Sequence, residues 1–445
     1  MTTCIDGPRQ ASPTTQSGTI TLRLLVLLAF IAATSPLATD LYLASFPAIQ
    51  QSLVTTPMMV QLTLTAYLIG VSIGQPIWGP LSDRYGRRRP LLISNALTVV
   101  SSVVVAFAPT IEVLIAARFV QALSAASGMV LARAMVADLA HGYAGVRALS
   151  LMMTVHGAVP VIAPAFGGLM ATVMPWRGVL VVFAVIVTFQ LIAAVILVPE
   201  TLPRERRAVR LRYSDLGRVL TRPAFSTYAL TLALAMSSLM AYIASSSFVY
   251  QEVLGLSPLL FGLSFAVNAT GMTAAGLISA ALARRRVHPA RTIACGLSGM
   301  LVSALLVVAA AASPWPILLV GAIFINAASA SFVMSNCMGL AMEQAHGIPG
   351  AGSAMLGMLM FGISAMVSPL AGLVDGPGTA VAMGAVMATM ALLATVAFVL
   401  GRAWVTRNPE SEAAFASTTT STRTSGDDAP SALLATDSFT PQEQT

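Results

Sequence analysis

Two charged residues, Asp40 and Arg118, lie well inside long apolar runs of the sequence. A charge in the centre of a bilayer costs about 2.5–3.5 kcal/mol on insertion scales, so each residue calls for an explanation. Asp40 comes seven residues before Pro47, and Arg118 comes seven residues after Ile111, which puts both about 10 Å below one membrane surface. Burial favours the neutral acid and a nearby arginine favours the carboxylate, a balance that suits reversible proton uptake. The alternative is a structural ion pair that only joins two helices.

A dense group of glycines and charges follows the second apolar run, in the segment Gly79-Pro-Leu-Ser-Asp83-Arg-Tyr-Gly86-Arg87-Arg-Arg89-Pro90. Glycine permits a tight turn and a close approach of two helices. We expect Asp83 to cap the turn and to pair with another element, and the arginines to anchor the loop at the membrane surface. The alternative interpretation is an ordinary basic loop that happens to contain glycine.

Proline and small residues dominate a third segment, Gly157-Ala-Val-Pro160-Val-Ile-Ala-Pro164-Ala-Phe-Gly167-Gly168. In a bilayer, small residues let helices pack closely, and proline is tolerated where neighbouring helices satisfy the freed backbone groups. An ordinary kinked packing helix is the plainest interpretation. His156 and Asn268 are further polar residues within apolar runs. A lone membrane histidine is more often a neutral hydrogen-bonding residue than a proton carrier.

The rest of the chain is apolar enough to place these residues in a membrane. Hydrophobic residues make up 56% of the 445 residues and charged residues 9%, whereas a soluble globular domain has about 25% charged residues. A helix needs about 20 apolar residues to cross the hydrocarbon core. The sequence therefore predicts an all-α membrane protein of about twelve helices, near 22–46, 58–80, 90–109, 112–137, 148–173, 177–198, 224–251, 259–283, 291–312, 315–342, 349–374 and 379–403.

Arginine placement predicts the orientation of these helices. The loops on one side hold Arg84, Arg87, Arg88, Arg89, Arg133, Arg147, the central-loop arginines from Arg204 to Arg222, including Arg210 and Arg212, and Arg284, Arg285, Arg286 and Arg291. The loops on the other side hold Glu112, Arg177, Glu252 and Asp375. This bias predicts cytoplasmic termini. We expect a cytoplasmic tail over 1–21, a six-helix half over 22–198, a cytoplasmic central loop over 199–223, a second six-helix half over 224–404 and a disordered tail over 405–445.

The composition argues against several other classes of function. The net charge of +7 comes from arginines in short loops, so it does not indicate nucleic-acid binding. The three cysteines are scattered, and the four histidines are not clustered with carboxylates. This pattern fits neither a disulfide framework nor a metal site. We expect no enzyme, no metal and no cofactor.

The segment 79–90 resembles motif A of the major facilitator superfamily at every diagnostic position. The resemblance implies two six-helix halves related by pseudo-symmetry. It also implies that the motif latches the halves in the outward-open state. Asp83 would then face the helix near 349–374, and Arg87 would pair with Asp138 at the end of the fourth helix.

Other segments resemble one branch of that superfamily, the bicyclomycin/chloramphenicol-resistance (Bcr/CflA) drug:proton antiporters. They are Thr39-Asp40-Leu-Tyr42-Leu-Ala-Ser-Phe-Pro47, with Ala44 where the branch usually has proline; Arg118-Phe-Val-Gln121-Ala, which resembles motif B; Arg133-Ala-Met-Val-Ala-Asp138; and Phe248 through Pro258. The arginine of motif B is linked to proton transfer in the family. The segment 157–168 is similar to the antiporter motif C, which is largely confined to exporters, and matches best from Pro164 to Gly168.

The resemblance implies a monomeric, proton-coupled exporter of small amphipathic drugs in the bacterial inner membrane, with lipid, protons and the drug as its partners. Asp40 and Arg118 would couple the proton, and Arg133 and Asp138 would belong with motif A. Substrate contacts are expected from Thr39, Asp40, Tyr42, Gln121, Met153, His156 and Asn268. The 23 methionines suit an adaptable cavity, although most must face lipid or the protein core. One rival is a metabolite exporter or symporter on the same fold, and another is a receptor or membrane-embedded enzyme.

Overall fold

A computed structural model describes residues 20–140, 142–207, 214–311, 313, 315–374, 376 and 378–407. Within these ranges the chain is helical apart from short connections. Eleven helices are long and apolar enough to cross a membrane, or twelve if one bent pair counts as a single span. The expected all-α membrane architecture is therefore present. The predicted terminal tails, apart from 20–21 and 405–407, lie outside the described residues, as do Arg210, Arg212 and Asp375.

The helices fall into two consecutive groups. The first group is α1 (Leu22–Ala32), α2 (Thr34–Leu43), α3 (Phe46–Ser52), α4 (Pro57–Tyr85), α5 (Arg88–Ala106), α6 (Ile111–Leu139), α7 (Gly142–Val173) and α8 (Trp176–Leu197). The second is α9 (Ser214–Leu220), α10 (Pro223–Phe248), α11 (Pro258–Arg284), α12 (Pro289–Ala311), α13 (Pro316–Gln344), α14 (Pro349–Val367) and α15 (Gly378–Arg407). Many of these helices begin at proline, whose missing N–H has no partner to lose in the first turn.

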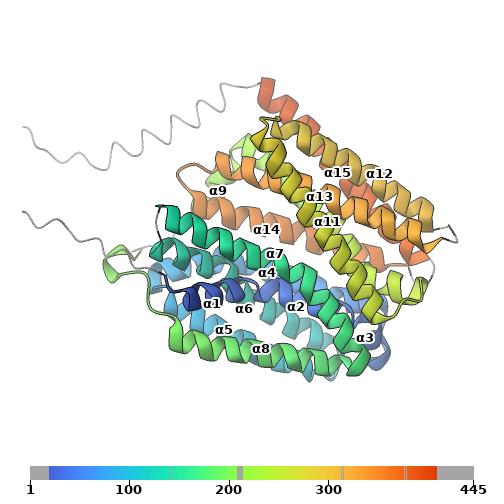
Figure 1. Cartoon of the computed structure of the whole chain (residues 1–445), viewed down its shortest axis with the longest axis horizontal. Coiled ribbons are helices and arrows are strands. Elements are labelled where there is room, and N and C mark those ends of the chain that lie inside the picture. Colours follow the sequence, from blue (N-terminus) through green and yellow to red (C-terminus); the bar gives the residue numbers. More distant parts are fainter. Residues whose placement is uncertain are drawn as a thin grey trace, which may run out of the picture.

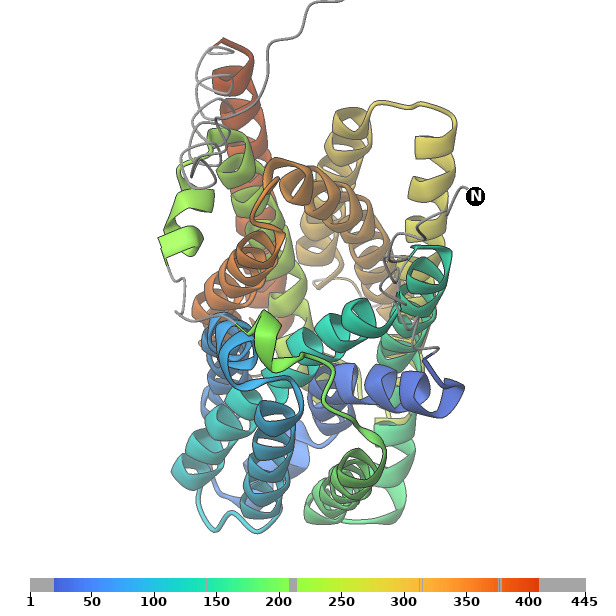
Figure 2. The ribbon, with the colours of Figure 1, turned by 90° about the vertical axis from the view of Figure 1, so that its left-hand side faces the viewer.

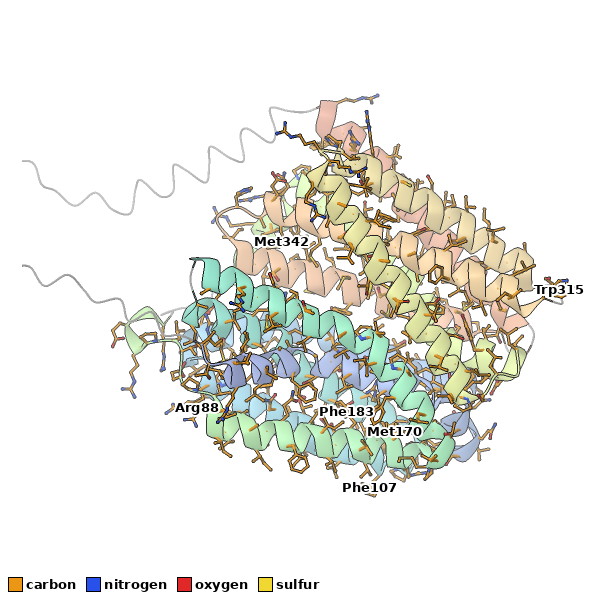
Figure 3. All side chains as sticks on the ribbon, viewed as in Figure 1. Arg88, Phe107, Met170, Phe183, Trp315 and Met342 are labelled. Atoms are coloured by element: carbon orange, nitrogen blue, oxygen red, sulfur yellow. The ribbon has the colours of Figure 1, made fainter. Side chains whose placement is uncertain are left out.

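The two groups form two bundles that lie side by side, from blue to green and from green to red in Figure 1. We call α1–α8 the N-terminal half and α10–α15 the C-terminal half. The loops with Arg87–Arg89 and Arg284–Arg286 mark what we call the arginine-rich end, which faces the viewer in Figure 2. Figure 3 shows Arg88 at this end and Trp315 at the opposite end.

The first predicted span, 22–46, is a broken helix. Helices α1 and α2 meet at an angle of 50°, with Ala33 between them. Pro36 explains the break, because it has no N–H to donate to the carbonyl of Ala32 four residues earlier. His156 on α7 lies close to the backbone of Ala32.

The two halves contact each other at the opposite end and in the middle of the bundle. Gln251 Nε2 donates to the carbonyl of Ala44 at 3.1 Å, and Gln61 Nε2 donates to Ser245 Oγ at 3.3 Å. Nearer the middle, Ser72 Oγ donates to the carbonyl of Met358 on α14 at 2.8 Å. The opposite end of the bundle is therefore closed.

Glycines allow two helices from different halves to touch at this closed end. A Cβ on Gly262 of α11 would overlap the carbonyl of Pro164 and lie 3.0 Å from Cα of Ala165, both on α7. A Cβ on Gly168 of α7 would overlap the carbonyl of Pro258. Backbone lies against backbone here, so only glycine fits without moving the helices apart.

Candidate functional site

A cavity of about 440 Å³ lies between the two halves, a volume in the range of small-molecule sites. Its wall comes from α1, α2, α4, α6 and α7 of the first half and from α10, α11, α13 and α14 of the second. The closing contacts of Ala44, Gln61 and Gly262 lie on its far side, toward the opposite end. The cavity reaches toward the arginine-rich end, where Arg133 and Met338 line it.

The cavity wall is mostly apolar and rich in methionine. Eight methionines line it: Met129, Met153, Met236, Met240, Met272, Met334, Met338 and Met360. Its strongly polar members are Asp40, Arg133, His156, Asn268 and Gln75. Unbranched, polarisable methionine side chains adapt to apolar ligands of different shape. Such a wall with a few polar groups suits small amphipathic molecules.

Asp40 is the one acidic residue on this wall among the described residues. It lies on α2, just beyond the bend, with 6% of its surface exposed. Within the described chain it forms no ion pair with Arg118 or any other residue. A buried carboxylate without a counter-ion is strongly destabilised unless it takes up a proton. The position of Asp40 on this wall is therefore the basis of the proposal made below.

The structure corrects the idea that Arg118 pairs with Asp40 or shares its cavity. Arg118 lies behind the wall, with its guanidinium carbon 4.4 Å from the ring centre of Tyr42 and 4.3 Å from that of Tyr67. Its Nη1 donates to the carbonyl of Ala38 at 3.2 Å. The ring of Tyr67, which lines the cavity, takes the place that an ion pair would need. Two aromatic faces stabilise the buried cation.

Gln121 holds Arg118 in this position. Its Oε1 accepts from Arg118 Nη1 at 2.8 Å, and its Nε2 donates to Ser102 Oγ at 2.8 Å. Gln121 is fully buried, does not line the cavity, and therefore lies too deep for the substrate contact expected of it. Tyr42 is also outside the wall, because its ring faces Arg118 and its hydroxyl bonds to Thr63 at 2.9 Å. The expected Thr39, Asp40, Met153, His156 and Asn268 do line the cavity.

Replacing Gln121 by leucine is expected to destabilise the protein by about 1–3 kcal/mol, because a hydrogen bond to a buried cation is lost. The measurement is thermal unfolding of the purified protein in detergent. Gln51→Leu is the matched control, since Gln51 is exposed, and should leave the unfolding midpoint unchanged. Equal midpoints for Gln121→Leu and wild type would show that Arg118 does not depend on this amide.

Asn268 provides a polar point on the second half of the cavity. Its Nδ2 donates to the hydroxyl of Tyr242 at 2.8 Å, and both residues line the wall. Its Oδ1 is buried without a partner among the described residues. An unpaired buried carbonyl oxygen is destabilising until a donor reaches it. A hydrogen-bond donor on a ligand would supply that partner.

The residues of segment 157–168 have different positions. Pro160 lines the cavity, whereas Pro164 and Gly168 form the contact with α11 described above. Gly167 lies against the carbonyl of Leu41 on α2, where a Cβ would overlap. Gly157 has open space around it. The close packing predicted for this segment thus belongs to its last five residues, from Pro164 to Gly168.

The motif of residues 79–90 forms an ion-pair cluster at the arginine-rich end. Arg87 Nε lies 3.0 Å from Asp138 Oδ2, as expected, and Arg87 Nη1 lies 2.5 Å from Asp83 Oδ1. Thr201 donates to the same Asp138 oxygen at 3.1 Å, and Glu200 Oε1 accepts from the Arg87 backbone N–H at 2.7 Å. The sequence did not predict that Glu200 and Thr201 of the central loop contact the motif. Their charge and polarity were the only features that distinguished them.

One expectation for this motif needs correction. Gly79 forms no turn, because it lies inside α4 with ordinary contact room toward Val130. The turn is made by Gly86 alone, whose φ of 90° is left-handed and whose missing Cβ leaves room for Glu200. Asp83 lies in the last turn of α4 and forms an ion pair with Arg87. The expected contact of Asp83 with α14 belongs to a state open at the opposite end, so it stays a prediction for that state.

Arg133 and Tyr67 are cavity residues that the sequence did not identify as such. Arg133 was grouped with the motif cluster, but it lines the cavity beside Met129 and His156. Its Nε donates to the carbonyl of Met129 at 2.5 Å. The available signal was its position on α6, five residues before Asp138. Five residues rotate by about 500° around a helix, so the two side chains point in directions about 140° apart.

Fold and cavity together are typical of a polytopic membrane transport protein with a cavity between its two halves. The family model "Major Facilitator Superfamily" matches residues 28–369. The chain belongs to this superfamily, and it is a multi-pass transporter of the bacterial inner membrane, not an enzyme.

Relatives and a solved structure agree with this assignment. The chain is 35% identical to an uncharacterized MFS-type transporter, YdgK, of Bacillus subtilis over 382 residues, 85% of this chain and 94% of the relative. It is 24% identical to a bicyclomycin resistance protein homolog of Haemophilus influenzae over 353 residues, 78% and 88% of the two chains. The crystal structure of a mutant of the nucleoside transporter NupG superposes with a TM-score of 0.70 at 12% identity, covering 86% of this chain and 100% of that chain.

Proposed function

We propose that the protein exports small amphipathic drugs or antibiotics of the bicyclomycin and chloramphenicol type in exchange for protons. The observation that carries this proposal is Asp40, a lone acid on the wall of a methionine-rich cavity. Similarity to a bicyclomycin resistance protein homolog supports the drug class. The glycine and proline packing of α7, similar to the antiporter motif, supports export.

The arginine-rich end is, on this proposal, the cytoplasmic end, because short basic loops remain in the cytoplasm. The cavity of this structure then receives a drug from the cytoplasm. Rocking of the N-terminal half (22–198) against the C-terminal half (224–404) about the cavity would expose it to the outside. The ion pairs of Arg87 with Asp83 and Asp138 would rearrange in that step.

Proton coupling follows from the shared cavity. Outside, a proton reaching Asp40 removes the charge and favours an empty, dry cavity that can turn inward. On the inside, release of the proton leaves a charged carboxylate. A hydrated drug, or a drug with a hydrogen-bond donor, stabilises this carboxylate better than the apolar wall does. Each inward proton contributes about 2.3 kcal/mol per 100 mV of membrane potential.

A metabolite carrier is the second candidate, and Arg133 with His156 on the cavity wall favours it. A carrier of charged metabolites needs fixed polar anchors, and these two residues are such groups. The methionine-rich remainder of the wall favours an amphipathic ligand instead. A transport assay decides between the drug exporter and the metabolite carrier.

The test is efflux of chloramphenicol from cells that lack their own drug pumps. We expect expression of the protein to lower drug accumulation and a protonophore to remove the effect. The control is the same strain producing the Gly262→Leu variant in an equal amount in the membrane. The leucine side chain should prevent closure of the opposite end. Equal accumulation with wild type and vector, for this drug and a lipophilic cation, would contradict drug export and favour the metabolite carrier.

A further inference from the structure

A positively charged group on the cavity wall has no acid to balance it. Arg133 is partly buried on α6, and its one hydrogen bond within the described residues goes to a carbonyl of its own helix. No described acid pairs with it, although Asp138 lies on the same helix, because Asp138 is engaged by Arg87 and Thr201. A guanidinium stays charged at any working pH. An anionic group that enters the cavity would balance this charge.

His156 lies close enough to Arg133 for the two groups to interact electrostatically, and both line the cavity. His156 also lies close to the backbone of Ala32 at the bend between α1 and α2. A neutral imidazole has one donor nitrogen and one acceptor nitrogen. Arg133 and His156 thus offer a ligand a cationic fork beside a hydrogen-bond acceptor.

The site lies apart from Asp40. His156 lies close to the backbone of Ala32, at the end of α1, whereas Asp40 lies near the other end of α2, eight residues further along the chain. Met129 and Met153 flank the Arg133 side, and Met236 and Met240 line the wall from the other half.

We propose that Arg133 and His156 form a head-group subsite for amphipathic acids that carry a hydrogen-bond donor next to the negative charge, as N-acyl amino acids do. The carboxylate would bind the Arg133 fork in two parallel hydrogen bonds. The adjacent amide N–H would donate to His156, and the acyl body would lie on the methionines toward Asp40. This substrate class rests on the proposed export in exchange for protons, and it adds anionic amphipathic compounds to the drugs named above.

The charge balance of this class suits an exporter. Asp40 and the carboxylate of the ligand remain apart, at the two ends of the cavity, so they do not repel each other strongly. An anion moving outward and a proton moving inward both follow the membrane potential, which is negative inside. Each exchange then moves two charges along the membrane potential, where a neutral drug exchanged for a proton moves one.

Three small molecules test the contributions of the negative charge and of the hydrogen-bond donor separately. N-benzoylglycine has both, its methyl ester lacks the charge, and N-benzoyl-N-methylglycine lacks the donor. Binding to the purified full-length protein in detergent is measured for each. We expect wild type to prefer the acid over the ester by at least tenfold and over the N-methyl acid by severalfold. Equal binding of acid and ester, or no binding of the acid, would overturn the proposal.

Variants of Arg133 and His156 test which residue is responsible for each binding preference. Arg133→Gln is expected to reduce the acid-to-ester preference at least tenfold, and Arg133→Lys, which keeps the charge but not the fork, to restore part of it. His156→Phe should remove the preference for the N–H over the N-methyl acid. Arg147→Gln is the matched control, since Arg147 is an exposed arginine on α7, and should bind as wild type.

Loss of acid and ester in equal proportion in Arg133→Gln would make Arg133 a structural or gating residue and contradict the subsite. Chloramphenicol efflux by wild type tests the proposed function separately. If that efflux fails while the acid preference and its dependence on Arg133 hold, the drug-export proposal is wrong and the subsite stands. If efflux succeeds and Arg133→Gln keeps the acid preference, the drug-export proposal stands and the subsite is wrong.

Discussion

The Asp40→Asn variant is expected to lose drug accumulation against a gradient. One proton charge at 100 mV supports a concentration ratio of up to about 50-fold, from about 2.3 kcal/mol. Asparagine cannot bind or release the proton, so the ratio should fall to near one. The measurement is steady-state drug distribution in proteoliposomes with an imposed membrane potential and pH gradient.

The same variant has a second readout. Exchange of labelled for unlabelled drug without a gradient should continue, because the amide resembles the protonated acid in size and polarity. Glu112→Gln is the control, since Glu112 is an exposed acid near the closed end, and should behave as wild type in both assays. Gradient-driven accumulation that survives in Asp40→Asn would remove Asp40 from the coupling mechanism.

The Gly262→Ala variant is expected to shift the protein toward the state open at the opposite end and to slow transport at least about tenfold. The new Cβ would overlap the Pro164 carbonyl and lie 3.0 Å from Cα of Ala165. Backbone atoms cannot move aside as a side chain can, so α7 and α11 must separate. The closed end is then destabilised relative to the other state.

Hydrogen–deuterium exchange locates this shift. We expect faster exchange in Val54–Thr56 and in Leu254–Ser257, and slower exchange around Gly86, when Gly262→Ala is compared with wild type. Gly276→Ala on the same helix is the matched control, because its Cβ would have only an ordinary contact, 3.5 Å from Ser331 Oγ. Equal exchange in the two variants would mean that Gly262 does not govern closure.

Local features of the sequence were enough to predict the membrane helices and two of the buried charges. Long apolar runs can only be helices in lipid, since every backbone group must be satisfied within the segment. The same reasoning placed Asp40 and Arg118 inside the bilayer, where both are indeed buried. Recognition of motif A correctly paired Arg87 with Asp138, because the motif encodes a short-range contact between neighbouring helix ends.

The side of each helix that meets the cavity could not be read from the sequence. A membrane helix is apolar all round, so its pattern does not mark the inward face as that of a soluble helix does. For this reason Tyr42 and Gln121 were expected in the cavity yet lie behind it with Arg118, while Arg133 was assigned to the motif cluster yet lines the wall.

The separation of Asp40 from Arg118 has the same origin. Equal depth in the bilayer follows from residue counting, but a contact also needs the two helices to turn the right faces toward each other. Here the ring of Tyr67 occupies that space and binds Arg118. Hydropathy along the chain was sufficient to show which groups are buried in the membrane. The packing of helices around the bend at Ala33 determined which of them line the cavity, because rotation about a helix axis is set by neighbours and not by hydropathy.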